Sequence, residues 1–343
     1  MPRPPHRPTI YDVAHEARVA ISTVSRVING SSEVSDATRE KVQAAIRTLQ
    51  FQPQRTARTL AQQESTTTVA VALPSATSMF FVEMLKGVKD ALRTRDIDLL
   101  LCNLGSSQPY PTLQRFLKRG AVDGVLLMAL PVDGAVADQL LNMQAPVVLL
   151  GSQCEGLDAF WWDDREGARM ATAYLAEQGH TRIGLVTAHA WSANAGPRLE
   201  GYRQALDEAG IAFDEDLVVA GQTTKHAGYS EEAGAEAMEA LLGLPTPPTA
   251  VFAASDVQAY GAWSYARSQG LVVPSDVSIV GYDDLKLSRF LDLTTVAQGM
   301  HEAGLMATQR LLERIDEDTA SRANVELPLT LSVRGSTAAL VTA

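Results

Sequence analysis

The chain has 343 residues, of which 46% are hydrophobic and 20% are charged. This length exceeds that of a domain with a single hydrophobic core and favours two or three domains of ~100–200 residues each. The composition is that of a globular protein and excludes extended disorder. Charge is unevenly distributed, because residues 1–63 hold nine Lys/Arg against five Asp/Glu, whereas residues 64–343 hold 20 against 35. A basic head on an acidic body is expected when one module contacts phosphate and the remainder has another task.

The two cysteines, Cys102 and Cys154, lie in unrelated segments and form neither a disulfide framework nor a CxxC metal site. The basic residues 1–13 contain no apolar stretch of the kind found in secretory signals. Apolar runs such as 125–130 are far shorter than the ~20 residues of a membrane span. These features predict a cytoplasmic protein that uses no cofactor and no metal.

Three short helices are predicted in the head, over 10–16 with an end near Arg18, over 21–29 and over 35–49, after a proline-rich N-terminus at 1–8 that we expect to be disordered. Thr9 and Asp12 have the spacing of a capping box at the start of the first helix. Two helices joined by a tight turn are typical of the helix-turn-helix motif. Six inward-facing apolar residues form the expected core: Val13, Ala17, Val24, Ile28, Val42 and Ile46.

The outward face of the second helix carries Ile21, Ser22, Ser25 and Arg26 at i, i+1, i+4 and i+5. Arg26 has the geometry to bind guanine O6 and N7, Ser22 to bond base edges, and Ile21 to contact a thymine methyl group. A solvated face on a small structural domain is the alternative that this spacing leaves open.

The amino-acid sequence of the head favours DNA binding. Residues 9–61 resemble, almost position for position, the DNA-binding head of the LacI/GalR family of transcriptional regulators. The matching positions are Tyr11-Asp12-Val13-Ala14, Thr23-Val24-Ser25-Arg26-Val27, Asn29, Val34-Ser35, Thr38-Arg39, Val42, Pro53 and Leu60-Ala61. The resemblance implies that Ile21, Ser22 and Arg26 read bases. It implies backbone phosphate contacts for Thr9, Thr23, Ser25, Asn29, Ser35 and Thr38.

Two residues depart from the family pattern. Arg18 stands where the turn usually has Gly, and Ala20 stands where the second helix usually has an N-cap Ser. Loss of an N-cap hydroxyl costs ~0.5–2 kcal/mol, and a non-Gly residue at positive φ is uncommon. These departures bear on DNA affinity and on the turn geometry, and they leave the predicted class unchanged.

The segment 54–62 is basic and too short for a stable isolated helix. The resemblance implies a hinge helix that orders on operator DNA, with Ala57 and Leu60 at the minor groove and Leu60 as a wedge that kinks the duplex. A plain linker is the alternative. The expected organisation is therefore a DNA-binding domain at 9–53, a hinge helix and linker at 54–66, and a body at 67–343.

The body alternates short apolar runs with amphipathic helices, which predicts parallel sheets covered by helices. The predicted strands are 69–73, 97–102, 122–128, 147–150, 182–187, 217–220, 250–253 and 277–280, and the helices include 81–95, 166–177, 199–208 and 255–268. This number of strands favours an α/β body of two doubly wound parallel-sheet subdomains. The chain lacks the GxGxxG, GK[ST], GxSxG and HExxH signatures, so nothing in it favours an enzyme.

The resemblance continues to about residue 335, where the body is similar to the family's effector domain and to periplasmic sugar-binding proteins. It implies one subdomain at 68–160 and 295–325 and another at 161–294 and 326–340, with ligand bound at the carboxyl ends of the strands. The matching landmarks are Phe80-Phe81, Gly179-His180, Arg198, Ser255-Asp256 and Gly281-Tyr282-Asp283-Asp284. The implied effector contacts are Phe80, Phe81, Asn194, Arg198, Ser255, Asp256 and Asp283.

The chemistry of these effector residues suits a sugar, because Arg198 offers several donors and Asp283 two acceptor oxygens for vicinal hydroxyls. Pairing of Arg198 with Asp283 is the alternative. Trp162 and Trp191 are expected either as cavity walls or in core and interface packing. Ser255 and Gly151 replace residues that sugar-responsive relatives often carry, so the particular effector does not follow from the resemblance.

Taken together, the sequence predicts a ligand-responsive transcriptional repressor that binds a pseudo-palindromic operator as a homodimer, with half-sites about one helical turn apart. A small-molecule effector, most consistent with a sugar, would control operator affinity. Because no heptad pattern follows Gly335, a dimer is favoured over a tetramer. The alternative is a small-molecule-binding protein or enzyme with a non-functional helical head.

Overall fold

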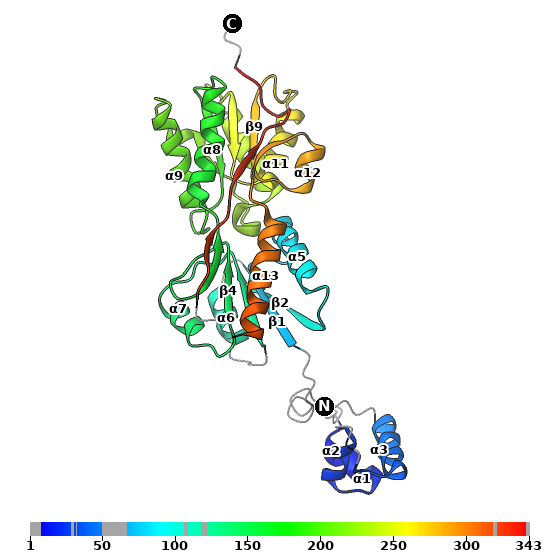
Figure 1. Ribbon diagram of the computed structural model, residues 1–343. Helices are drawn as coiled ribbons and strands as arrows, with labels where there is room; N and C mark the ends of the chain where they lie inside the picture. The colour runs from blue at the N-terminus through cyan, green and yellow to red at the C-terminus, as the bar shows by residue number, and fades with distance from the viewer. Residues whose placement is uncertain are drawn as a thin grey trace. The chain divides into compact units, whose positions relative to one another are not determined.

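The computed structural model describes residues 8–28, 31, 33–49, 67–105, 109–117, 122–317 and 321–340. The chain divides into two compact units, Met1–Thr66 and Thr67–Ala343 (Figure 1). No helix in the described ranges is long and apolar enough to cross a membrane.

The first unit contains the three predicted helices, α1 (Ile10–Ala17), α2 (Ile21–Ile28) and α3 (Asp36–Leu49). The capping box is confirmed at α1, where the Thr9 N–H donates to Asp12 Oδ2 at 2.7 Å and the Asp12 N–H donates to Thr9 Oγ1 at 3.4 Å. The buried core consists of Val13, Ala14, Ala17, Val24, Val27, Val42 and Ala45, against which Ile46 packs. Of the predicted core, the Ile28 side chain lies outside the described residues.

The turn between α1 and α2 keeps the geometry that usually calls for glycine. Arg18 caps α1 with φ 54° and ψ 46°, the left-handed conformation, and the Val19 N–H donates to the Ala14 carbonyl at 3.0 Å. Ala20 then starts α2, since its carbonyl accepts from the N–H groups of Thr23 and Val24 at 2.9 and 3.2 Å. The turn therefore forms with a strained Arg18 and without a capping hydroxyl at Ala20.

The second unit contains two six-stranded sheets of the same strand order. The first sheet runs β11-β5-β4-β3-β1-β2 and is wholly parallel, and the second runs β12-β10-β9-β8-β6-β7 with β12 alone antiparallel. The first-sheet strands are β1 (Thr67–Leu73), β2 (Ile97–Asn103), β3 (Gly124–Met128), β4 (Val147–Leu150), β5 (Asp158–Trp161) and β11 (Asn324–Glu326). The second-sheet strands are β6 (Ile183–Thr187), β7 (Val218–Ala220), β8 (Ala250–Ala253), β9 (Ser278–Asp283), β10 (Thr294–Ala297) and β12 (Thr330–Ser332). The predicted pair of doubly wound subdomains is confirmed.

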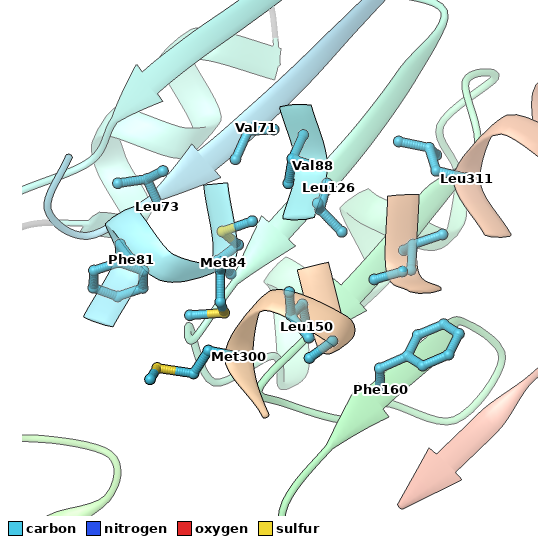
Figure 2. Close-up of a cluster of buried hydrophobic side chains, with 14 of the residues drawn as sticks. Val71, Leu73, Phe81, Met84, Val88, Leu126, Leu150, Phe160, Met300 and Leu311 are labelled. Carbon is cyan, nitrogen blue, oxygen red and sulfur yellow. The ribbon is translucent and has the colours of Figure 1, made fainter. Parts of the chain in front are cut away.

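Helices cover both faces of each sheet. Around the first sheet lie α5 (Met79–Leu92), α6 (Pro109–Leu117), α7 (Gly134–Leu141) and α13 (Met300–Asp316). Around the second lie α8 (Asp164–Glu177), α9 (Ala195–Glu208), α10 (Glu231–Leu242) and α11 (Asp256–Ser268), followed by the short α12 (Lys286–Phe290). Figure 2 shows the largest core cluster, where Met84 of α5 and Met300 and Leu311 of α13 pack over strand residues such as Leu126 and Leu150.

Four strands escaped prediction, namely β5, β10, β11 and β12. Their sequences are DAFW, TTVA, NVE and TLS, in which polar residues interrupt or shorten the apolar run, and β11 and β12 lie at sheet edges. Strand pairing also corrects the expected subdomain limits. Trp161 and Glu326 pair with each other in the first sheet, and residues 295–297 pair with β9 in the second sheet. The hydrogen bonds between strands therefore place residues 161 and 326 in the first subdomain and residues 295–297 in the second.

Candidate functional site

The outward face of α2 is open to solvent in the first unit. Ile21 is 42% exposed, and Ser22 and Arg26 are also exposed. The Arg26 guanidinium lies 3.8 Å from the Glu33 carboxylate, with both side chains mostly in water. An exposed ion pair at this distance contributes little to the stability of the fold. Arg26 is therefore available to a ligand that approaches this face.

The polar residues that the resemblance assigns to phosphate contacts lie on all three helices of the first unit. Thr9 caps α1, Thr23 is half-buried on α2, and the Ser35 and Thr38 hydroxyls lie 2.9 Å apart at the start of α3. Ser25 is also half-buried on α2. Three further predicted contacts, Asn29, Ala57 and Leu60, lie outside the described residues.

A cavity of about 240 Å³ lies between the two sheets of the second unit. The lining residues follow the carboxyl ends of β1, β2, β3, β6, β7, β8 and β9, where ligands bind in doubly wound folds. The first-sheet side contributes Pro74, Ser75, Ser78, Phe80, Phe81, Gly105, Pro109, Tyr110, Ala129, Leu130 and Pro131. The second-sheet side contributes Trp191, Ser192, Ala193, Asn194, Arg198, His226, Ala227, Tyr229, Ser255, Val257 and Asp283.

Strained backbone is concentrated at this cavity. Among the described residues, seven non-glycine positions have positive φ, and four of them line the cavity. These are Ala129 at 45°, His226 at 51°, Ala227 at 63° and Asp283 at 118°. Such conformations persist only where the surrounding structure imposes them, and they gather at ligand-binding sites.

Arg198 is held in place by a residue that sequence reasoning missed. Its Nε and Nη2 donate to Asp164 Oδ1 at 2.9 and 2.7 Å, its Nη1 donates to the Ala254 carbonyl, and its guanidinium lies 3.8 Å from the centre of the Tyr282 ring. Asn194 Nδ2 donates to the other oxygen of Asp164 at 2.7 Å. Arg198 thus pairs with Asp164, whereas the alternative expected from sequence was pairing with Asp283.

Asp283 ends β9 and is 4% exposed at the cavity wall. Burial raises the pKa of its carboxyl well above the usual value, and the neighbouring Arg198 charge offsets part of that rise. The Asp256 N–H donates to this carboxyl. A buried acid with raised pKa, held toward the cavity by a strained backbone, is suited to bonding the hydroxyl of an uncharged ligand.

Asp256 corrects the predicted set, because it does not line the cavity. Its carboxylate accepts from the Leu285 N–H at 2.7 Å, the Ser288 hydroxyl at 2.5 Å and the Thr295 hydroxyl at 2.6 Å. Burial raises its pKa to about 7, against the opposing effect of these hydrogen bonds. Asp256 therefore ties α11 to α12 and β10 and positions the chain beside Asp283.

The predicted aromatic residues divide between cavity and core. Phe80 lines the cavity and makes edge contacts with Phe81 and Trp162, at centroid distances of 5.2 and 6.3 Å. Phe81 is 8% exposed and belongs mainly to the core, although it reaches the cavity. Trp162 packs in the core and donates to the Gln298 carbonyl at 2.7 Å. Trp191 lines the cavity and stacks on His189.

Ser255 reaches the cavity, where it caps α11 by accepting the Gln258 N–H at 3.2 Å. Two tyrosines that sequence reasoning missed also line it. Tyr110 donates to the Pro131 carbonyl at 2.9 Å. Burial raises the pKa of the Tyr229 hydroxyl, and the Arg198 charge and a hydrogen bond with Ser192 offset part of that rise. Neither tyrosine belongs to a recognisable motif, since only long-range packing brings them to the cavity.

Both units match families of known proteins. Residues 9–54 match bacterial regulatory proteins of the lacI family, and residues 172–337 match the periplasmic binding protein-like domain. The HTH-type transcriptional repressor CytR of Escherichia coli is 35% identical over 339 residues, which cover 97% of each chain.

Solved structures agree over nearly the whole chain. A complex of the transcriptional regulator CelR with cellobiose has a TM-score of 0.68 and 34% identity, covering 96% of this chain and 100% of that one. The Lac repressor dimer bound to operator and the anti-inducer ONPF has a TM-score of 0.71 and 28% identity, covering 97% and 100%. With its helix-turn-helix head and its periplasmic-binding-protein-like body, this chain belongs to the LacI family of transcriptional regulators.

Proposed function

We propose that the chain represses transcription as a homodimer on a pseudo-palindromic operator, and that a hydroxylated effector in the cavity controls its operator affinity. The observation that carries this proposal is the cavity itself, which takes residues from both sheets around Arg198, Asn194 and Asp283. A ligand there favours one relative arrangement of the two subdomains. Coupling between such sites has a magnitude of ~1–3 kcal/mol.

The expected base contacts remain Ile21, Ser22 and Arg26, whose exposure on α2 supports this role. The operator is identified by using the full-length protein to select the sequences that it binds from a pool of random DNA. Sugars and sugar derivatives are then titrated against the complex of the protein with the selected operator. An operator response to a ligand that calorimetry places at one site per chain supports the proposal. Asp283→Ala should abolish the response and keep operator affinity without ligand. Unchanged ligand binding in that variant would place the site elsewhere.

A homodimer is supported by exposed apolar side chains on the second unit. The edge strand β2 presents Leu99, Leu100 and Leu101 at 40–48% exposure, and Phe290 of α12 is 76% exposed. Uncovered apolar edges favour association, and the related Lac repressor structure is described as a dimer. Leu100→Lys with Phe290→Asp should yield a monomer in analytical ultracentrifugation, while Phe213→Asp, at another exposed phenylalanine, should leave a dimer. A wild-type monomer at micromolar concentration would contradict the homodimer.

The hinge remains a sequence-based prediction, because residues 54–62 lie outside the described ranges. Leu60→Ala should reduce operator bending and specific affinity, with little change on random DNA, since no charge is removed. A FRET measurement of the bend angle tests this, and an unchanged angle would reduce the segment to a linker.

The alternative function is a small-molecule-binding protein or enzyme whose helical head does not bind DNA. Deletion of residues 1–63 distinguishes it from a regulator. A regulator should lose operator binding and keep ligand binding, whereas the alternative never binds a selected operator.

A further inference from the structure

Three short segments of the chain join the two sheets of the second unit. The chain passes from the first sheet to the second at 162–163, returns at 298–299 and passes to the second sheet again at 327–329. A change in the relative arrangement of the two subdomains must bend or twist these three crossovers. A contact that joins the crossovers to one another therefore controls how freely the subdomains move.

The first crossover is hydrogen-bonded to both of the others. The Leu327 N–H donates to the Trp161 carbonyl at 2.7 Å, which extends the pairing of β11 with β5 into the third crossover. The next residue, Trp162, donates its indole Nε1–H to the Gln298 carbonyl at 2.7 Å and so reaches the second crossover. One backbone carbonyl and one side chain thus fasten the three crossovers together.

The hydrogen bond between Trp162 and Gln298 is shielded from water. The two residues are 7% and 2% exposed, and the indole packs in the same core cluster as Met300 and Leu327, which lie at the other two crossovers. Loss of a donor at a buried carbonyl is not readily repaired by water, so it destabilises the arrangement that contains the bond. The bond therefore favours the arrangement of the subdomains in this structure over any that separates the crossovers.

Trp162 also lies beside the cavity. Its ring makes an edge contact with Phe80 at a centroid distance of 6.3 Å, and Phe80 lines the cavity from α5. A shift of Phe80 would reach the Gln298 carbonyl through a single side chain. Trp162 is thus placed between the cavity wall and the crossovers.

We propose that Trp162 is a positioning residue for the control of operator binding. Its indole N–H fastens the second crossover to the first and holds the subdomain arrangement with which the protein binds operator in the absence of effector. This inference rests on the proposed function, in which the relative arrangement of the subdomains sets operator affinity.

Trp161 supplies a matched control at the neighbouring position. Its indole Nε1–H donates to Asn324 Oδ1 at 2.9 Å within the first sheet, and Asn324 is exposed. Water can replace this donor, and the loss of the bond leaves the three crossovers fastened. Trp161→Phe therefore removes the same atoms as Trp162→Phe without affecting the second crossover.

Amide hydrogen exchange of the full-length protein without ligand measures the fastening. Trp162→Phe should speed exchange by about tenfold or more in peptides that cover 297–300 and 326–329, because the crossovers separate more often. Trp161→Phe should leave both peptides at the wild-type rate. Unchanged exchange in β3 and β8 shows that both sheets remain folded. Wild-type exchange in both peptides of Trp162→Phe would overturn the proposal.

A second variant separates the hydrogen bond from packing. Benzothienylalanine incorporated at Trp162 keeps the fused ring and carries sulfur in place of the N–H group, so it removes the donor without leaving a void. It should speed exchange in the same peptides as Trp162→Phe does. An effect of Trp162→Phe alone would assign the effect to packing and would overturn the role of the hydrogen bond.

Operator affinity measured without ligand tests the consequence for function. Both Trp162 variants should bind the selected operator about fivefold or more weakly than wild type, and Trp161→Phe should match wild type. Faster exchange with unchanged operator affinity would overturn the positioning role and leave the proposed function intact. If the wild-type protein selects no operator, the proposed function fails, and the exchange rates still decide whether Trp162 fastens the crossovers.

Discussion

Two arginines in two regions of this molecule show how surroundings decide what a charge does. Arg26 on α2 lies 3.8 Å from Glu33 with both side chains mostly in water, whereas Arg198 at the cavity is buried and bonded to Asp164 at 2.7 Å. The first charge lies in water, where its loss leaves no buried group without a partner. The second is part of the packed structure, and only its two unbonded donors remain for another partner.

The largest expected effect is on Arg198. Arg198→Ala leaves the Asp164 carboxylate and the Ala254 carbonyl without their donor, so the free energy of unfolding of the second unit should fall by about 3–5 kcal/mol. Urea unfolding followed by tryptophan fluorescence measures this. Arg169→Ala is the matched control, since that α8 arginine pairs with Glu166 in a more exposed position and should cost no more than about 1 kcal/mol. Equal losses would mean that burial of the pair is unimportant.

The next effect concerns pH. The raised pKa of Asp256, about 7, means that the folded protein holds its proton while the unfolded chain releases it near the usual 3.8. This contribution to stability is full below about pH 4 and is lost as pH rises through about 7, at about 1.4 kcal/mol for each unit of difference. Asp283 acts in the same direction.

Carboxylates with lowered pKa, such as Glu232 at about 2, act only below this window, where their contribution is lost as pH falls. His180 and His226, whose pKa values burial lowers, act in the opposite direction within the window, because the unfolded chain binds a proton there that the folded protein does not. Asp256→Asn leaves these histidines unchanged. Urea unfolding at pH 5 and at pH 7.5 should therefore show a smaller loss of stability, or a larger gain, with rising pH in that variant than in wild type. An equal slope in both proteins would show that Asp256 is ionised throughout.

The exposed arginine should affect recognition alone. Arg26→Ala should weaken operator binding by ~1–3 kcal/mol and random DNA binding much less, because a base contact is lost. The free energy of unfolding of the first unit should stay within about 0.5 kcal/mol of the wild-type value, as expected for a surface position. Competition gel shifts provide the affinities. A similar loss on both DNAs would reduce Arg26 to a phosphate contact.

The smallest effect tests the start of the same helix. Ala20→Ser supplies an N-cap hydroxyl to α2, which should raise the free energy of unfolding of the first unit by about 1 kcal/mol. Thermal melting of the first unit by circular dichroism measures the gain. Ala44→Ser, at an exposed position inside α3, is the control and should give no gain. No difference between the two variants would show that the N-terminus of α2 is satisfied in another way.

Much of the fold was predictable from short stretches of sequence. The capping box of Thr9 and Asp12, the three head helices and strands such as β4 and β8 depend on residues within a few positions of one another. The resemblance placed Phe80, Asn194, Arg198, Ser255 and Asp283 at the effector site, and all five line the cavity. Edge strands such as β11 were missed because Asn324 and Glu326 flank a single apolar residue, Val325, and so leave no apolar run.

The sequence by itself thus determined the helix-turn-helix head, the alternating α/β pattern and the family. Only the tertiary structure decided that Arg198 pairs with Asp164, that Asp256 faces α12 and β10, and that Tyr110 and Tyr229 reach the cavity. The reason is physical: caps and periodicity are set by neighbours in the chain, whereas the partner of a buried charge is set by which strand ends and helix termini the two sheets bring together.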